Sequence, residues 1–287
     1  MFQTVAFTKQ TNMRGGVILL GGFDGLHVGH RRLLARALEY GLPVGVMTIV
    51  GGKPNGCLFT LRERERIFSL AGVDFAFELP FEGIREMSSE EFIEALEAQF
   101  APVAFVCGED FRFGKGALGT PESLRAKTRA QVDVLPLMEL GGEKVSSSTV
   151  KRLLGAGELT MVGELLGEPF FLLGEVVSGR KVGRTIGFPT ANMIYPEEKF
   201  SIPLGVYETR VVVDGRTYKG ITNFGAKPTF SDGQVCVETF LDGFSGDLYG
   251  REITVRFVRK IRDIQKFESV EKLKAQLQID LAAIRSD

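Results

Sequence analysis

The chain has 287 residues, of which 44% are hydrophobic and 25% are charged, and its formal net charge at pH 7 is −1. This length exceeds what a single hydrophobic core usually supports, so we expect two domains, and the composition excludes a disordered or low-complexity protein. A net charge so close to zero gives no long-range attraction to nucleic acid or to an anionic membrane. We therefore expect neither as a partner, and local groups must hold any anionic ligand.

The three cysteines, Cys57, Cys107 and Cys236, are far apart in the sequence and form no C-x-x-C pair. This pattern argues against a disulfide framework or a zinc ribbon, and it favours buried thiols in a reducing compartment. No apolar run approaches the roughly 20 residues that span a bilayer, and the N-terminus lacks the layout of a signal peptide. The sequence predicts a soluble cytoplasmic protein and leaves its oligomeric state open.

In the first half of the chain, short apolar runs alternate with amphipathic helical patterns. We expect strands over 16–21, 43–50, 73–79, 102–108 and 132–137, and helices over 28–40, 60–72, 88–100, 120–130 and 147–157. Apolar strands that are separated by helices and buried on both faces are typical of a parallel α/β sheet. The fold class predicted for residues 1–165 is therefore α/β and Rossmann-like.

The second half is dominated by alternating and β-branched segments over 170–177, 205–224, 234–242 and 251–260. Asp214 and Gly215 stand between two strand patterns as a hairpin turn. A helical pattern closes the chain, with Ser269 as its N-cap. These features predict a small antiparallel β-barrel with a terminal helix over residues 166–287.

The only two histidines, His27 and His30, stand three residues apart in the Gly-rich segment GGFDGLHVGH, just after an apolar strand. Open α/β sheets bind ligands beyond the carboxyl ends of their strands, where glycines and a helix N-terminus suit a phosphate. Imidazoles at such a place can donate hydrogen bonds to oxygens whose charge grows in a transition state. Two alternatives are purely structural histidines and a zinc or iron site that includes Asp24. We favour nucleotide binding.

Three segments of the first half together resemble a known family. GGFDGLHVGH carries the H-x-G-H signature of nucleotidyltransferases, and GEDFRFGKGA and VSSSTVKRLL are similar to the G-x-D-F-x-F-G and S-S-[ST]-x-[IV]-R motifs of prokaryotic bifunctional riboflavin kinase/FAD synthetases. Their order and spacing match the FMN adenylyltransferase module of that family. The resemblance implies a nucleotidyltransferase domain that joins FMN to the AMP part of ATP and releases pyrophosphate.

The resemblance also implies site residues, with His27 and His30 as the catalytic pair. ATP is expected to bind Gly22, Phe23, Asp24, Gly25, His27, His30, Ser146, Ser147, Ser148, Lys151 and Arg152, and FMN is expected to bind Asp110, Phe111 and Arg112. Hydroxyls and free N–H groups at the three serines precede a helix, which suits a phosphate. Ordinary N-capping would explain one of these serines but not three.

In the second half, SGRKVGRTIGFPTANMIYP (178–196) resembles the riboflavin kinase motif G-R-x-x-G-F-P-T-A-N, and GITNFGAKPTF (220–230) also looks like this family. Thr190 and Asn192 are hard oxygen donors that suit Mg²⁺ bridging to phosphates. Glu238 occupies the position of the family's catalytic base and would accept the proton of the ribityl 5′-hydroxyl; an exposed strand Glu paired with a Lys is the alternative. The implied ATP contacts are Gly179, Arg180, Gly183, Arg184, Gly187, Phe188 and Pro189, and the implied flavin contacts are Arg262 and Phe267.

The chain departs from the family pattern at three places. Lys151 stands where the serine motif has Arg, segment 50–56 has no His, and Phe240 replaces the His of V-E-T-H. Because Lys cannot reproduce a bidentate guanidinium contact, a kinase with a weakened or inactive adenylyltransferase domain is one alternative. A non-catalytic flavin or nucleotide sensor is another. We predict the bifunctional enzyme, with Mg²⁺ as cofactor, ATP as co-substrate, and riboflavin, FMN and FAD as its other small-molecule partners.

Overall fold

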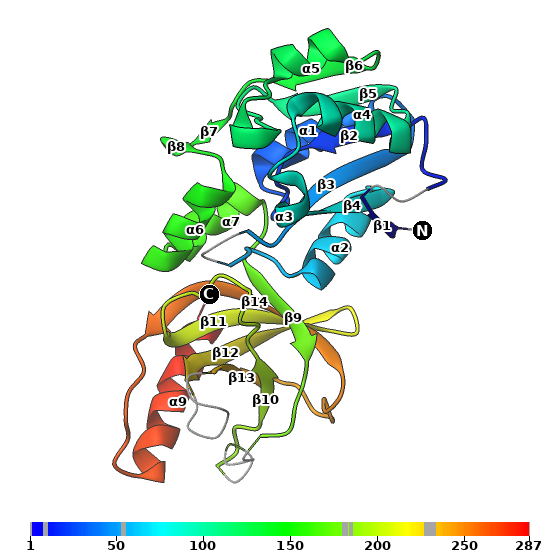
Figure 1. Cartoon of the computed structure of the whole chain (residues 1–287). Coiled ribbons are helices and arrows are strands. Elements are labelled where there is room, and N and C mark those ends of the chain that lie inside the picture. Colours follow the sequence, from blue (N-terminus) through cyan, green and yellow to red (C-terminus); the bar gives the residue numbers. More distant parts are fainter. Residues whose placement is uncertain are drawn as a thin grey trace. The chain divides into compact units, whose positions relative to one another are not determined.

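The computed structural model describes residues 2–7, 11–52, 56–179, 183, 186–226 and 234–286. The chain divides into two compact units, Met1–Thr149 and Val150–Asp287 (Figure 1). Within the described ranges, no helix has both the length and the apolar character that crossing a membrane requires.

The first unit is built on six parallel strands, which are β1 (Gln3–Ala6), β2 (Val17–Leu20), β3 (Val44–Val50), β4 (Phe75–Pro80), β5 (Ala104–Gly108) and β6 (Gln131–Leu135). They lie in the order β1-β4-β3-β2-β5-β6 (Figure 1). The chain runs outward from β2 through β3 to β4, and then returns to the other side of β2 for β5 and β6. The strand order thus reverses between β2 and β5, where open α/β sheets bind their ligands.

Helices connect these strands, and a short hairpin follows the last of them. These elements are α1 (Val28–Leu38), α2 (Leu61–Leu70), α3 (Phe81–Ile84), α4 (Ser89–Phe100), the 3-10 turn η1 (Lys115–Ala117), α5 (Pro121–Lys127), β7 (Glu139–Leu140) and β8 (Glu143–Lys144). The predicted α/β class and its five strands are confirmed as β2 to β6, whereas the edge strand β1 was not predicted. Ser88 caps α4 as expected, because its hydroxyl accepts from Glu91 N–H while the Glu91 carboxylate accepts from Ser88 N–H.

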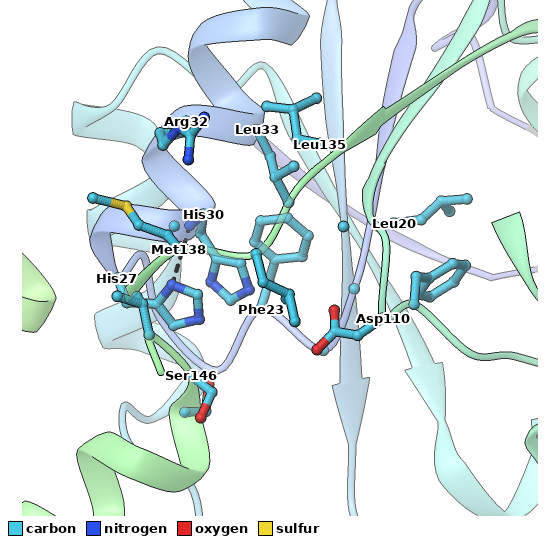
Figure 2. A pocket seen from close by; sticks show the side chains of 18 of the residues that line it. Leu20, Phe23, His27, His30, Arg32, Leu33, Asp110, Leu135, Met138 and Ser146 are labelled. Atoms are coloured by element: carbon cyan, nitrogen blue, oxygen red, sulfur yellow. Dashed lines mark hydrogen bonds between the residues drawn. The ribbon is translucent and has the colours of Figure 1, made fainter. Parts of the chain in front are cut away.

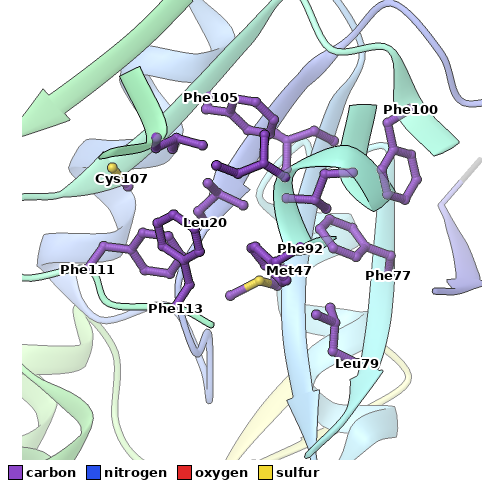
Figure 3. Close-up of a cluster of buried hydrophobic side chains, with 14 of the residues drawn as sticks. Leu20, Met47, Phe77, Leu79, Phe92, Phe100, Phe105, Cys107, Phe111 and Phe113 are labelled. Atoms are coloured by element: carbon purple, nitrogen blue, oxygen red, sulfur yellow. The ribbon is translucent and has the colours of Figure 1, made fainter. Parts of the chain in front are cut away.

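One face of the sheet packs against α4 and α5. Leu20 of β2 and Phe77 of β4 share a buried cluster with Phe92 of α4 (Figure 3). Phe111 and Phe113, in the segment after β5, belong to the same cluster, and their ring centroids are 5.4 Å apart. This segment is therefore fixed to the core by two phenyl rings.

The second unit is an antiparallel barrel of six strands, which are β9 (Phe171–Glu175), β10 (Thr190–Ile194), β11 (Gly205–Val213), β12 (Arg216–Ala226), β13 (Val235–Leu241) and β14 (Glu252–Arg262). They lie in the order β10-β13-β12-β11-β14-β9. The barrel closes where the N–H of Val177, just after β9, donates to the carbonyl of Asn192 on β10 at 2.8 Å. The predicted antiparallel barrel is confirmed.

Helices α6 (Ser147–Ala156), α7 (Leu159–Leu166) and α9 (Val270–Arg285) complete the chain, and the boundary between the two units falls within α6. Asp214 and Gly215 form the predicted hairpin turn between β11 and β12, with φ of 48° and 77°. Ser269 caps α9 as expected, since its hydroxyl accepts from Lys272 N–H.

The barrel interior contains hydroxyls as well as aromatic rings. The ring of Tyr207 is perpendicular to that of Phe257, and the Oγ1 atom of Thr222 is 2.9 Å from those of both Thr209 and Thr239. All three threonines are 0% exposed. Because buried hydroxyls need partners, this ladder across β11, β12 and β13 helps to define how the strands align.

Candidate functional sites

A cavity of about 330 Å³ opens at the carboxyl ends of β2, β5 and β6 in the first unit (Figure 2). Of the residues predicted to bind ATP, the lining contains Gly22, Phe23, His27, His30, Ser146 and Ser147. It also contains all three residues predicted to bind FMN, Asp110, Phe111 and Arg112. Segments that are far apart in the sequence therefore converge at the reversal of strand order.

The two histidines are held by the backbone around the start of α1. His27 is the N-cap of this helix, and its Nδ1 accepts from His30 N–H at 3.1 Å. His30 Nδ1 lies 2.8 Å from the carbonyl oxygen of Gly25. The His27 and His30 rings stack with centroids 3.6 Å apart, and Phe23 stacks on His30 at 4.2 Å (Figure 2). A hydrogen bond at Nδ1 thus fixes the orientation of each ring.

This arrangement determines the protonation state of His27. Its Nδ1 accepts a hydrogen bond, so the neutral ring carries its proton on Nε2 and can donate from there. Burial, and secondly the charge of the neighbouring His30, lower the pKa of His27 from 6.5 to about 2. His27 is therefore a neutral hydrogen-bond donor throughout the physiological pH range.

The turn that carries these rings has an unusual backbone. Phe23 is fully buried and has a φ of 24°, in the left-handed region that non-glycine residues rarely adopt. Gly25 has a φ of 153°, and a Cβ there would lie 2.6 Å from the Phe59 ring. Asp24 is buried, and neither Asp24 nor Gly25 belongs to the lining. These two predicted residues thus lie outside the cavity lining.

The serine motif divides into separate structural roles. Ser146 Oγ accepts from Thr149 N–H at 3.1 Å, as an N-cap does, and it also lines the cavity with Ser147. Ser148 lies outside the lining. Lys151 and Arg152 follow in α6 and belong to the second unit.

On the other side of this cavity, Asp110 forms an ion pair with Lys144 of β8 at 2.9 Å. Arg112 turns one guanidinium nitrogen onto the Phe111 carbonyl at 2.8 Å. Lys144 and the lining residue Arg32 were not predicted from the sequence. Their positions in the sequence could have identified them, because Lys144 stands two positions before Ser146 and Arg32 stands two positions after His30.

The alternative of a metal site at Asp24, His27 and His30 gains no support from the geometry. The Nδ1 atoms of both histidines are engaged with backbone groups, and the two rings stack on each other. In the part of the chain that the structure describes, no group of three His, Cys, Asp or Glu side chains is arranged to hold a metal ion.

A second cavity, of about 360 Å³, lies in the second unit between the barrel and α9. Of the predicted residues, its lining contains Gly183, Phe188, Thr190, Asn192, Glu238, Arg262 and Phe267. Arg180 and Arg184 lie outside the described residues, and Gly179, Gly187 and Pro189 are not in this lining.

The centre of this second site is a row of polar side chains across three strands. Asn192 of β10 pairs with Glu238 of β13, which pairs in turn with Asn223 of β12. Asn223 Nδ2 donates to Glu238 Oε2 at 3.4 Å. The cross-strand neighbours of Glu238 are thus two asparagines, which does not fit the alternative of a strand Glu paired with a Lys.

Two glycines of the motif pack closely in this site, Gly179 against the row itself and Gly183 against the backbone of Phe188. A Cβ at Gly179 would lie 2.6 Å from Asn192 Nδ2, and a Cβ at Gly183 would lie 2.1 Å from the Phe188 carbonyl oxygen. Only glycine allows such close approaches. Asn192 Nδ2 donates to the Thr190 carbonyl at 3.3 Å, so its side-chain oxygen is the atom suited to act as a ligand.

Thr190 and Asn192 also line a third cavity of about 260 Å³, together with Pro189 and Tyr249. These two residues therefore stand where two cavities adjoin. Phe240, which replaces the family's His, is opposite Thr190 in the register, and its ring centroid is 5.0 Å from that of Phe188. Both rings line the second cavity, whose wall is therefore apolar at this point.

Comparisons with known proteins agree with this division into two sites. A family model described as riboflavin kinase matches residues 166–286, and one described as FAD synthetase matches residues 9–149. A bifunctional riboflavin kinase/FMN adenylyltransferase of Pseudomonas fluorescens is 35% identical over 292 residues, which cover 95% of this chain and 93% of that protein. The chain belongs to this family.

Two further similarities extend over nearly the whole chain. The Escherichia coli K12 protein is 36% identical over 95% of this chain and 92% of its own length. A crystal structure from Streptococcus pneumoniae, described as a macrolide-efflux protein, is 30% identical with a TM-score of 0.86 over 98% of each chain. The family that the sequence motifs suggested is thus confirmed over nearly the whole chain.

Proposed function

We propose that the chain converts riboflavin to FAD in two steps. In the first, the 5′-hydroxyl of riboflavin takes the γ-phosphoryl group of ATP, which gives FMN and ADP. In the second, a phosphate oxygen of FMN attacks the α-phosphorus of another ATP, and the bond to the β-phosphate breaks to release pyrophosphate. We assign the second step to residues 1–165 and the first to residues 166–287. The observation that carries the proposal is that the two motif sets line two separate cavities.

For the kinase step, Glu238 is the proposed general base. Its carboxylate lines the second cavity, and Asn223 orients it by a hydrogen bond. From this position it accepts the proton of the 5′-hydroxyl as the oxygen attacks the γ-phosphorus. We place the flavin in the second cavity, where Val206, Ile221 and Phe267 provide apolar contacts, and ATP in the third. This placement revises the expectation for Gly183 and Phe188, which were predicted to contact ATP but line the second cavity.

Thr190 and Asn192 are the proposed protein ligands of Mg²⁺. They fit this ion because both offer neutral oxygen atoms where the flavin and ATP cavities adjoin, and Mg²⁺ takes few protein ligands and completes its shell with phosphates and water. When bound, Mg²⁺ screens the charge of the phosphate oxygens. Gly179 contributes by letting the backbone pack against the Asn192 amide.

For the adenylyl transfer, the proposed catalytic residues are His27 and His30. The Nε2–H of the neutral His27 donates to a phosphate oxygen whose charge grows in the transition state. The N-terminus of α1 adds partial positive charge at the same place. Because FMN itself is the nucleophile, the protein needs only to align the substrates and stabilise charge.

We also propose the cytoplasm as the site of action. Cys57, Cys107 and Cys236 are far apart in the sequence and form no C-x-x-C pair, which suits a reducing compartment. Both steps consume ATP, which that compartment supplies.

The deciding experiment is a time course of purified protein with riboflavin, ATP and Mg²⁺, followed by chromatography. We expect FMN to appear first and then to give way to FAD. A parallel reaction started from FMN tests the second step by itself. Accumulation of FMN without FAD in the first reaction, together with unchanged FMN in the second, would overturn the adenylyltransferase assignment. Unchanged riboflavin in the first reaction would overturn the kinase assignment.

A further inference from the structure

At one wall of the second cavity, a buried carboxylate of α9 holds a cationic lining residue. Arg262, the last residue of β14, donates from Nε to both oxygens of Asp280 at 3.1 Å and from its second guanidinium nitrogen, Nη2, to Oδ2 at 2.9 Å. The side chain of Asp280 is 1% exposed, and that of Arg262 is 15% exposed. Such a planar, two-point contact fixes the orientation of a guanidinium group as well as its position.

The remaining contacts of this pair complete a fixed network. Gln276 Nε2 donates to Asp280 Oδ1 at 2.9 Å, and Arg262 Nη1 donates to the Asp263 carbonyl at 3.2 Å. The Arg262 guanidinium also lies over the Phe267 ring, 5.8 Å from its centroid. Because the charge of Arg262 is compensated by a buried carboxylate, this side chain offers a flat face and oriented N–H groups rather than a general attraction for phosphate.

The same helix also supplies an apolar wall of the cavity. Leu273 and Leu277 line it, and they precede Asp280 by seven and three residues, so all three lie along one side of α9. Two other contacts fix the end of α9. Arg285 forms an ion pair with Asp242, and Lys219 donates to the Ile284 carbonyl. None of these four residues lines this cavity. Asp280 thus connects α9 to Arg262, a residue that lines the cavity.

We propose that Asp280 is a positioning residue for the flavin, an inference that rests on the proposed kinase function. By holding Arg262 and the Leu273–Leu277 wall in register, Asp280 shapes the part of the cavity that receives the flat isoalloxazine ring. Glu238 is the proposed base of the γ-phosphoryl transfer, and Asp280 takes no part in that step. Asp280 therefore governs the affinity for flavin rather than the rate of the chemical step. Asp280 itself touches neither substrate.

The test is a kinetic comparison of Asp280→Asn with the full-length protein. We expect the KM for riboflavin to rise on the order of 10- to 100-fold, because Asn keeps only part of the contact with Arg262 and a hydrogen bond between charged groups contributes on that order. The kcat and the KM for ATP should change by less than about threefold. Asp242→Asn is the matched control, because it removes a second ion pair of α9 without touching Arg262. Adenylylation of added FMN reports on the first unit in each preparation.

A double-mutant comparison separates positioning from simple stabilisation of the helix. If Asp280 acts through Arg262, Asp280→Asn should add little to the KM for riboflavin once Arg262→Ala is present. An equal increase with and without Arg262, or the same increase in Asp242→Asn, would overturn the inference. Arg262→Lys, which keeps the charge but loses the two-point contact, gives the same test if Asp280→Asn does not fold. Failure of the wild-type protein to phosphorylate riboflavin would instead overturn the proposed function.

Discussion

The two sites are built in different ways. In the first unit, one turn and the start of α1 provide both histidines, and backbone groups hold their rings. In the second unit, Asn192, Glu238 and Asn223 come from three strands and meet only because of the register. The first site therefore depends on local backbone conformation, whereas the second depends on how distant strands align. Sequence changes should accordingly affect the two activities separately.

Glu238→Gln is expected to produce the largest difference between the sites. The amide keeps the size of the side chain but cannot accept the proton, so FMN formation should fall by about 10²- to 10⁴-fold. Adenylylation of added FMN should be unchanged. Glu252→Gln, at an exposed position on β14, is the matched control. Initial rates within a few fold of wild type would exclude Glu238 as the base.

His27→Asn is the corresponding change in the first site. Asn is a good N-cap but lacks the imidazole donor, so adenylyl transfer should fall on the order of 100-fold or more while riboflavin phosphorylation is retained. His27→Ala should lose the same activity and, in addition, about 1 kcal/mol of unfolding free energy because the cap is lost. Denaturant titration measures that difference. Parallel losses of both activities in a folded His27→Asn protein would contradict the separation of the sites.

The interiors of the two units differ as well, because the barrel buries a threonine ladder in addition to its aromatic rings. Thr222→Val leaves the hydroxyls of Thr209 and Thr239 each without one partner, so we expect about 1–3 kcal/mol of destabilisation. Thr217→Val, at an exposed position on the same strand, is the control and should be nearly neutral. Equal effects of the two substitutions in denaturant titrations would show that the ladder contributes nothing specific.

The smallest expected effect is a pH dependence that belongs to the first unit alone. The pKa of His27 is lowered from 6.5 to about 2 on folding, so below pH 6.5 the unfolded chain binds a proton that the folded chain does not. Stability should therefore fall as the pH drops, by about 1.4 kcal/mol between pH 7.5 and 5.5. The difference between wild type and His27→Asn in denaturant titrations isolates this contribution. A wild-type curve parallel to that of the variant would refute it.

The site of the first unit was easier to predict from the sequence than the site of the second unit. The strand–turn–helix around His27 was predictable because motif, glycines and helix start are contiguous. The sequence also predicted that the serine motif precedes a helix. Which serine caps that helix, and which ones line the cavity, depends on side-chain orientation. Asn223 and Asp280 were not selected, since their importance comes from a strand register and from where α9 packs. Segment 220–230 contains Asn223 and resembles the family, but no local pattern distinguishes Asn223 or Asp280 from its neighbours.

The closure of the barrel has a consequence for its motions. Asn192 supplies both a proposed ligand for Mg²⁺ and the carbonyl that accepts from the Val177 amide. Amide hydrogens exchange with solvent when such a contact opens locally, and a ligand that binds only the closed form slows the exchange. The Val177 amide should therefore act as an internal reporter, exchanging more slowly once nucleotide and metal occupy the site nearby.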